Sequence, residues 1–555
     1  MRRLLLLCLA LGLFQCATLQ NNGSGSGHSA GPFRWENANL YFLLTDRFYN
    51  GNPANDVNFG RTAESGKLRG FMGGDLKGIT KKLRDGYFDR LGITALWFTP
   101  VMEQIHGQVN EGTGGTYGFH GYWIRDWTRL DPNFGTEADL FELVQTAHRH
   151  GIRIVLDVVI NHTGPVTEQD PLWPADWVRT SPQCSYKNYE TTVPCTLVKN
   201  LPDVKTESNA PTDLPAALLE KWKQEGRLDR ELAELDAFFQ RSGYPRAPRF
   251  YIIKWLTDYI RKFGVDGYRC DTAKHVEESV WAELRKEADI AFADWKKTHP
   301  ADVLDDTPFY MVGEVYNYGI SAGRQFDFGD RKVNYFAEGF NSLINFEFKS
   351  DAKSPYETIF AKYSDLLHNP LQGKSVLNYI SSHDDGGPFD KERSKPLEAG
   401  VKLLLCPGAA QVYYGDETSR TLNIPGTEGD ATLRSFMNWD ELARHAVRNG
   451  HDVNDVLAHW QKLGRFRKAH PAVGAGRHVM ISKTPYVFRR TYTDGAYTDT
   501  VVVGLDLPAG DKTIDVRGVF ADGTILRDYY SGQKVKVTGE KVIVRSKFNL
   551  VLLGR

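Results

Sequence analysis

The chain has 555 residues, enough for a large core and for more than one structural unit. Hydrophobic residues make up 41% and charged residues 25%, as in ordinary soluble enzymes. The 68 basic and 69 acidic residues leave a formal net charge of -1, so charge gives no reason to expect nucleic acid or an anionic membrane surface as a partner. We expect a monomer that acts on a neutral substrate.

The N-terminal sequence predicts an export signal over residues 1–16. Two arginines precede the apolar run Leu4–Phe14, which is too short to span a bilayer as a mature helix. Cys16 stands where a bacterial lipoprotein is cleaved and acylated, and ordinary cleavage near Ala17 is the alternative. Residues 17–32 are rich in Gly, Ser and Asn and predict a flexible tether. We therefore expect an exported protein that is periplasmic, secreted, or held on the outer membrane or cell surface through a lipidated Cys16.

Apolar strands alternate with amphipathic helices over most of the remaining chain. The predicted strands are 40–44, 94–99, 153–159, 267–270, 309–312, 375–380 and 411–414, with a weaker one around 343–348. The predicted helices include 78–91, 137–151, 250–263 and 277–297. This alternation favours an α/β fold, a (β/α)₈ TIM barrel, over a doubly wound open sheet, because no glycine-rich nucleotide motif is present.

Two regions depart from the barrel pattern. A loop-rich insertion domain over 163–248, with a helical patch at 214–239, follows the third strand and divides the barrel into 33–162 and 249–468. Residues 469–555 change to short alternating strands with turns between them. That pattern predicts a C-terminal antiparallel β-sandwich domain.

The cysteines fall into distinct settings. Cys184 and Cys195 lie close together in the insertion, where an oxidising compartment would favour a disulfide between them. Cys270 and Cys406 lie in apolar segments and are expected to be inert core thiols.

Polar clusters stand at the ends of four predicted strands. They are Asp157–His162, Arg269–Asp271 with Lys274 and His275 following, Gly313–Val315, and Ser381–Asp385. Taken singly, an Asp at a strand end is often a helix cap or a turn former. Four clusters in order favour a catalytic site instead, because the functional face of such a barrel lies at the carboxyl ends of its strands.

These clusters, with His120–Trp123 and Tyr413–Glu417, resemble the signature regions of the alpha-amylase family, glycoside hydrolase family thirteen. The resemblance covers nearly all of the mature chain. Glu103–Gly107 and Asp271–Val276 look especially like the periplasmic alpha-amylases of Gram-negative bacteria. The resemblance implies endo-acting hydrolysis of alpha-1,4-glucosidic bonds in starch-like glucans and maltodextrins, with retention of the anomeric configuration.

By this resemblance Asp271 is the nucleophile, Glu314 the general acid/base and Asp384 the third carboxylate. A retaining glycosidase needs two carboxyl groups ~5–5.5 Å apart. Arg269 lies two positions before Asp271, so both side chains point to the same side of the strand, and the cation keeps Asp271 ionised. Glu314 must start protonated, and nearby negative charges would raise its pKa.

The resemblance also implies a set of residues that bind substrate. The histidines that would hydrogen-bond the sugar at the cleavage point are His120, His162 and His383, and the ring of Tyr122 would stack under that sugar. Lys274 and His275 would contact the leaving group. Asp430 and Arg434 would contact a second sugar. Asp157 is expected to support Arg269. Chloride-dependent members have Asn where this chain has Ser382, so chloride activation is not expected.

Calcium is the implied cofactor, and it prefers six to eight oxygen ligands. The resemblance implies a site between insertion and barrel, with Asn161, Asp203, the carbonyl of His275 and Glu190 as ligands. A second site, similar to a calcium loop of the cyclodextrin glucanotransferases, would use residues from two N-terminal segments: Asn50, Asn52, Asn55, Asp56, Asp75 and the carbonyl of Gly73. Without calcium, the same residues are ordinary turn formers.

Several other activities share these features. They are a transglycosylase, an enzyme that cleaves alpha-1,6 bonds, an exo-acting maltogenic enzyme, and a glucan-binding protein without catalysis. The presence of Asp271, Glu314 and Asp384 argues against the last of these.

Overall fold

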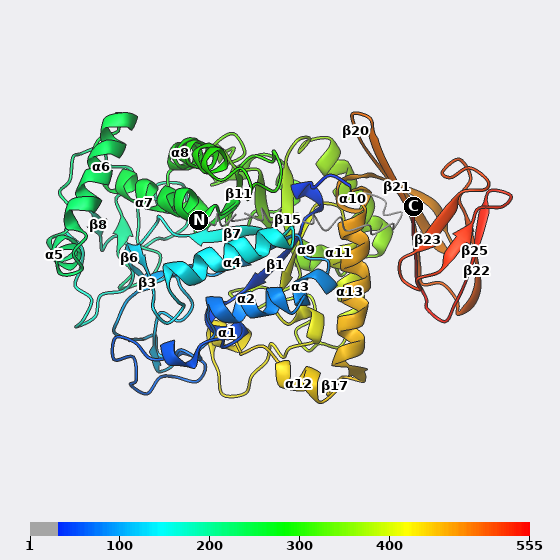
Figure 1. Cartoon of the computed structure of the whole chain (residues 1–555), viewed down its shortest axis with the longest axis horizontal. Helices are drawn as coiled ribbons and strands as arrows, with labels where there is room; N and C mark the ends of the chain where they lie inside the picture. The colour runs from blue at the N-terminus through cyan, green and yellow to red at the C-terminus, as the bar shows by residue number, and fades with distance from the viewer. Residues whose placement is uncertain (1–30) are drawn as a thin grey trace, which may run out of the picture. The chain divides into compact units, whose positions relative to one another are not determined.

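Eight parallel strands close into a barrel in the computed structural model, which describes residues 31–555 (Figure 1). They are β1 (Asn39–Leu43), β2 (Ala95–Phe98), β7 (Arg153–Val158), β10 (Gly267–Cys270), β11 (Tyr310–Gly313), β14 (Ser342–Asn345), β15 (Ser375–Tyr379) and β16 (Ala409–Tyr413). In β1 and β7 every residue is buried, as expected for parallel strands covered on both faces. The predicted (β/α)₈ barrel is confirmed, and each predicted strand overlaps an observed one.

Three helices around the barrel begin and end near predicted positions: α4 (Glu137–Arg149), α7 (Pro248–Phe263) and α8 (Glu278–Thr298). Three further helices, for which no bounds were predicted, are α10 (Tyr356–His368), α11 (Pro396–Leu404) and α13 (Val453–Ala469). Helix α4 starts with a capping box, in which Thr136 and Asp139 bond each other's backbone N–H groups.

The predicted helix 78–91 is wrong as a single element, and the predicted helical patch at 214–239 consists of two helices. A glycine makes each break. Gly86 has φ +68° and separates α2 (Leu76–Arg84) from α3 (Tyr87–Arg90). Gly226 also has φ +68° and separates α5 (Ala216–Gln224) from α6 (Leu228–Ser242). Glycine adopts this left-handed conformation without steric cost, so it ends a helix that hydrophobic periodicity alone would continue.

The insertion packs on the barrel through aromatic side chains. Helices α5 and α6 lie at the left of Figure 1, beside α7. The rings of Phe239 on α6 and Tyr251 on α7 have their centroids 5.0 Å apart. In the same insertion β8 (Val178–Arg179) pairs with β9 (Asp203–Val204), and the disulfide between Cys184 and Cys195 closes a loop. The predicted disulfide is present in the structure, while Cys270 and Cys406 are free and buried, as expected.

The C-terminal region is an antiparallel β-domain, as predicted. A six-stranded sheet contains β19 (Arg477–Lys483), β20 (Tyr486–Asp494), β21 (Tyr497–Leu505), β26 (Val551–Gly554), β23 (Ile525–Asp528) and β24 (Lys534–Lys536), and the pair β22 (Gly510–Asp515) and β25 (Lys541–Ser546) packs against it. Along β21, Val501 and Val503 join the barrel core, whereas Val502 joins a separate core between the two sheets. This period of two shows that the large sheet is buried on both faces.

Residues 31–555 form one compact unit, so the boundaries predicted inside it stay predictions. The export signal, Cys16 and most of the tether lie outside the described residues. Within residues 31–555, no helix is both long and apolar enough to cross a bilayer.

Candidate active site

A cavity of about 590 Å³ opens where the barrel strands end. Asp271 directly follows β10 and Glu314 directly follows β11, while Asp384 lies in the loop after β15. All three carboxylates line this cavity. His120, Tyr122, His162, His275, His383, Asp430 and Arg434 line it as well. The structure therefore brings most of the predicted substrate-binding residues to one place.

Arg269 lies beneath the carboxylates and contacts three of them. Its Nη1 bonds Asp271 and lies 3.1 Å from Asp157 Oδ1, and its Nη2 lies 2.9 Å from Glu314 Oε1. The side chain is 1% exposed. Burial opposes its charge, but the surrounding carboxylates hold the pKa of Arg269 well above its usual value. Arg269 is therefore a permanent cation that positions Asp271 and Glu314 side by side.

Glu314 has the environment of an acid that stays protonated. Burial raises its pKa well above the usual value, and the negative charges of Asp271 and Asp384 add to that shift, against Arg269. Its Oε2 accepts the backbone N–H of Thr272 at 2.8 Å. The carboxyl group is therefore both fixed in orientation and able to supply a proton.

Asp384 is held in the opposite protonation state. Burial would raise its pKa, but the neighbouring His383, Arg269 and Arg434 lower it below the usual value. The hydroxyl of Ser382 donates to Asp384 Oδ1 at 3.0 Å. The cavity therefore combines an ionised carboxylate with a protonated one, as acid–base catalysis requires.

Tyr122 lies between two histidines. Its ring centroid is 5.8 Å from that of His120 and 5.3 Å from that of His383, with 20° between the planes in each pair. Burial lowers the pKa of both histidines and of His162, to about 4 for His383. These rings are therefore neutral at ordinary pH and can hydrogen-bond uncharged sugar hydroxyls.

Asp157 and Lys274 lie beside the cavity and do not line it. Asp157 accepts hydrogen bonds from Trp97 Nε1 at 2.9 Å and from the Tyr122 hydroxyl at 2.8 Å, in addition to its contact with Arg269. Lys274 donates to the carbonyl of Tyr316 at 3.2 Å. Asp157 therefore supports Arg269, and Lys274 reaches substrate only if its side chain moves toward the cavity.

Several residues that line the cavity were not predicted from the sequence. They are Arg69, Glu111, Thr113, Thr116, Phe119, Trp123, Leu197, Leu201, Thr272, Tyr316, Glu428, Gly429 and Ala431. Thr272 and Tyr316 follow the predicted carboxylates within two positions, so their place on the chain was a usable signal. The first four come from loops that only the tertiary fold brings to the cavity.

A comparison with known families identifies the chain. The family model described as "Alpha amylase, catalytic domain" matches residues 42–462, and this range includes all three carboxylates. The chain belongs to the alpha-amylase family. It is therefore an enzyme of the glycoside hydrolase type, which confirms the family expected from the signature regions.

Curated relatives within this family carry out different reactions. The chain is 36% identical to the periplasmic alpha-amylase of Escherichia coli (strain K12), over 84% of this chain and 72% of that enzyme. It is 25% identical to the cyclomaltodextrin glucanotransferase of Thermoanaerobacterium thermosulfurigenes, over 87% of this chain but only 63% of that enzyme. Membership of the family therefore leaves open whether water or a sugar accepts the cleaved chain.

A solved alpha-amylase from Anoxybacillus has a similar fold. It superimposes with a TM-score of 0.64 at 23% identity and covers 94% of this chain and 99% of its own. At this level of identity the likeness supports the fold alone.

The first predicted calcium site has the oxygen arrangement that a cation needs. The amide oxygen of Asn161 faces the carbonyl of His275 at 2.8 Å and Asp203 Oδ1 at 3.3 Å, with no donor between them. A rotated amide would donate to both oxygens, and a bound cation would instead be shared by all three. Burial raises the pKa of Asp203 to about 9, although Arg179 Nε lies 2.9 Å from its Oδ2, so calcium would add positive charge on the side of the carboxylate that faces Asn161. Glu190 is exposed and makes no side-chain hydrogen bond or ion pair in residues 31–555.

The second predicted site is only partly assembled. Asn50 Nδ2 donates to both oxygens of Asp56, at 2.9 and 3.0 Å, and Gly73 lies against the same two side chains. The amide oxygens of Asn50 and Asn55 are buried without a partner in the described chain. Such orphaned oxygens are unfavourable unless a cation or water reaches them, so these residues fit calcium.

Two of the predicted ligands in this second loop are less suited to the metal. The Asp75 carboxylate accepts N–H groups from Gly51, Asn52 and Gly78, the last at 2.6 Å, and it caps helix α2. Asn52 contributes its backbone N–H to Asp75. The structure therefore gives Asp75 a sufficient role that requires no metal.

Proposed function

We propose that the protein hydrolyses alpha-1,4-glucosidic bonds within starch-like glucans and maltodextrins by double displacement, with retention of configuration. The observation that supports this most is the single guanidinium of Arg269 shared by Asp271 and Glu314. Two carboxyl groups that contact the two terminal nitrogens of one guanidinium lie close together. Retaining glycosidases need such a short separation, whereas inverting glycosidases need a longer one.

In the first step Asp271 attacks the anomeric carbon and forms a covalent glycosyl ester. Glu314 transfers its proton to the glycosidic oxygen, the bond between that oxygen and the anomeric carbon breaks, and the leaving chain departs. In the second step the Glu314 carboxylate takes a proton from water, whose oxygen attacks the anomeric carbon and releases Asp271. Asp384 stabilises the positive charge that develops on the sugar in both transition states.

The neutral groups around the sugar orient it without competing for the proton. His120, His162 and His383 donate to hydroxyls, and Tyr122 offers a ring for the apolar face of the sugar. We assign Asp430 and Arg434, joined at 3.2 Å, to a neighbouring sugar, and Lys274 and His275 to the leaving group.

Transglycosylation is the second candidate, because cyclomaltodextrin glucanotransferases are among the relatives. Both activities use the same covalent intermediate and differ only in the acceptor that resolves it. Incubation with amylose and with pullulan, followed by product analysis, separates the candidates. Linear maltooligosaccharides from amylose support hydrolysis, whereas cyclic products or cleaved alpha-1,6 bonds point to the alternatives.

We also propose that the protein is exported and binds calcium. Export is supported by the periplasmic relative and by the Cys184–Cys195 disulfide, which forms in oxidising compartments. Calcium bound to Asp203 of the insertion and to Asn161 and the His275 carbonyl of the barrel would join the two parts, because its charge stabilises the three oxygens. Mass spectrometry of the mature N-terminus tests the lipidation of Cys16.

A further inference from the structure

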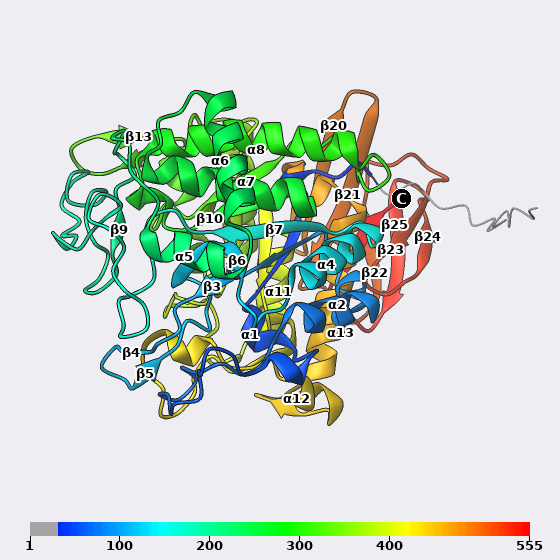
Figure 2. The same ribbon diagram turned by 60° about the vertical axis from the view of Figure 1, so that its left-hand side comes forward.

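Three loops meet at the side of the cavity where Asp430 lies. They are residues 66–70, the hairpin of β4 (Val109–Asn110) and β5 (Gly115–Thr116), and residues 425–430. Figure 2 shows the hairpin beside the yellow segment that follows β16. Backbone hydrogen bonds join residues 66–70 to the hairpin, from Gly66 N to the carbonyl of Gly115 at 2.9 Å and from Tyr117 N to the carbonyl of Arg69 at 3.0 Å. Side chains of residues 66–70 then join this pair of loops to residues 425–430.

The Arg69 side chain contacts both of the other loops. Its Nη1 donates to Glu111 Oε2 at 2.8 Å and to Thr116 Oγ1 at 3.1 Å, and its Nη2 donates to the carbonyl of Glu428 at 3.2 Å. We call these four residues the Arg69 clasp, and all four line the active-site cavity. The side chains of Arg69 and Glu111 are 12% and 43% exposed. The clasp therefore joins the three loops across one side of the cleft.

The clasp lies near Asp430, one of the two residues assigned to a sugar next to the cleavage point. Burial raises the pKa of Asp430; the negative charge of Glu111 adds to this shift, and the positive charge of Arg69 opposes it. Lys274, assigned to the leaving group, lies among other rings, with its Nζ 5.1 Å from the ring centroid of Tyr316. With Asp430 and Arg434 assigned to a sugar on the glycone side, the clasp faces the sugars that remain attached to Asp271 after the bond breaks.

We propose that the Arg69 clasp bounds the glycone side of the cleft and limits how many glucosyl units the enzyme contacts before the cleaved bond. The proposal rests on the proposed action on alpha-1,4-glucans. Thr113 lines the same part of the cavity, and its hydroxyl is buried without a partner in the described chain, so it can bond a sugar hydroxyl there. Because a partly exposed ion pair contributes little free energy, the clasp can also open to admit an internal stretch of polymer.

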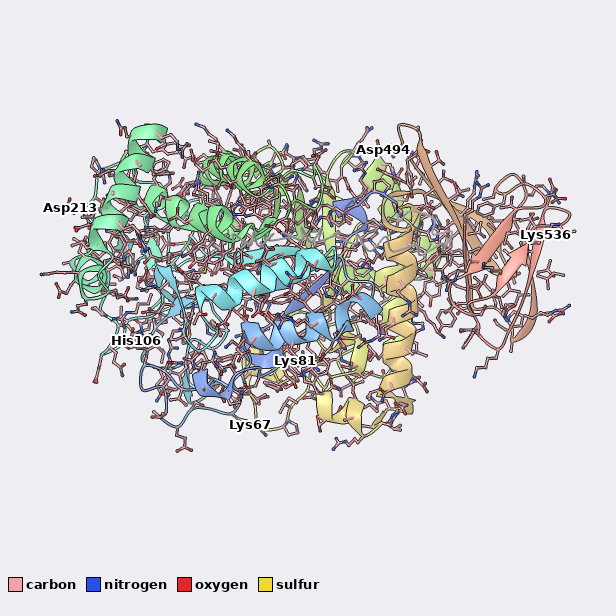
Figure 3. All side chains as sticks on the ribbon, viewed as in Figure 1. Lys67, Lys81, His106, Asp213, Asp494 and Lys536 are labelled. Carbon is pink, nitrogen blue, oxygen red and sulfur yellow. A yellow bond between two sulfur atoms is a disulfide. The ribbon has the colours of Figure 1, made fainter. Side chains whose placement is uncertain are left out.

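Binding measurements test the clasp without turnover. In a Glu314→Gln background, calorimetry with maltotriose to maltoheptaose should show affinity rising with chain length until the bounded side is full. Adding Arg69→Ala should move this plateau to a longer chain, because the hairpin and residues 425–430 can then separate. Lys67→Ala is the matched control: Lys67, labelled in Figure 3, donates to the carbonyl of Pro425 at 2.6 Å but does not line the cavity. The control should keep the original plateau.

Turnover gives a second, independent measurement. With end-labelled maltoheptaose, Arg69→Ala should lengthen the main glycone product by at least one glucosyl unit, and Arg69→Lys should shift it less. An unchanged plateau together with an unchanged product in Arg69→Ala overturns the clasp. If Arg69→Ala shifts the binding plateau but the parent protein cleaves no glucan, the clasp is supported and the proposed function is refuted.

Discussion

Arg269 Nη2 lies 2.9 Å from Glu314 Oε1, yet burial keeps the pKa of Glu314 well above its usual value. The other terminal nitrogen of Arg269 bonds Asp271. One cation therefore fixes the distance between nucleophile and acid, while the removal of Glu314 from water keeps it protonated.

The first prediction concerns the two carboxylates. Glu314→Gln should lower kcat on amylose by ~10²–10⁴-fold, the usual contribution of a general acid. The loss should be much smaller on a maltoside with an activated phenol leaving group, which needs little protonation. Asp271→Asn should remove nearly all turnover on both substrates, because no covalent intermediate can form. Steady-state kinetics on the two substrates check this, and an Asp271→Asn variant within about tenfold of the parent would contradict it.

The second prediction concerns pH. Because Glu314 has a raised pKa in the folded protein, its contribution to stability is present below the ordinary Glu pKa of about 4.3 and is lost as pH rises toward the folded value. Glu314→Gln cannot titrate at this position. The stability of the parent relative to this variant should therefore fall with rising pH, by at most about 1.4 kcal/mol per pH unit.

Melting curves of the parent and of Glu314→Gln at a series of pH values give this comparison, and all other titrating groups are common to both proteins. Parallel curves from pH 4 upward would show that Glu314 is ionised in the folded protein. The same deprotonation should appear as the alkaline limb of kcat/KM in the parent.

The third prediction concerns stereochemistry. Two successive inversions at the anomeric carbon return the starting configuration, so the first reducing sugar released should be the alpha anomer. Proton NMR during the first minutes of hydrolysis distinguishes the anomers before they equilibrate. Early beta product would mean a single displacement and would remove Asp271 from its assigned role.

The sequence could predict the carboxylates because two simple rules determine where they lie. Strand alternation directs Arg269 and Asp271 to the same side, and parallel strands bring Asp271 and Glu314 to one end of the barrel. The sequence could not predict the Arg69 clasp. Its contacts join residues 42 and 359 positions apart, and these distances close only after the barrel has formed.

Asp75 illustrates a different limit. An aspartate in a turn-rich loop suits both a calcium ligand and a helix cap, since each role needs carboxylate oxygens. The structure shows the cap, with Gly51, Asn52 and Gly78 as donors. The helix breaks at Gly86 and Gly226 could not be predicted for a similar reason. Hydrophobic periodicity carries no information about the sign of φ.

The fourth prediction concerns the disulfide. Replacing Cys184 and Cys195 by Ser should lower the free energy of unfolding by about 2–3 kcal/mol in the chain-entropy model, given the 11-residue separation. The loop also holds His275, whose Nδ1 lies 2.8 Å from the carbonyl of Thr192. Denaturant titration with and without dithiothreitol measures the effect. The reductant should lower the midpoint of the parent and leave the double variant unchanged, and an equal response in both would contradict the prediction.

The fifth prediction concerns calcium, with two sites that single variants can separate. Asp203→Asn should remove the ion shared with Asn161 and the His275 carbonyl. Asn55→Ala should remove the ion of the N-terminal loop, because the Asn55 amide oxygen has no other partner in residues 31–555. Asp75→Ala is less informative: loss of the α2 cap alone costs ~1 kcal/mol, with or without metal.

Metal analysis after equilibrium dialysis should find two ions per parent chain, one in each single variant and none in the double variant. Calcium that binds only folded protein should also raise the melting temperature in a concentration-dependent way, and each variant should lose part of that rise. The two variants are controls for each other, since a general loss of folding would remove both ions at once. If Asn55→Ala keeps the stoichiometry of the parent, Asn55 is not a required ligand. If Asp203→Asn keeps both ions, no calcium is bound between Asn161, Asp203 and the His275 carbonyl. A rotated Asn161 amide that donates to the other two groups then explains the contacts there.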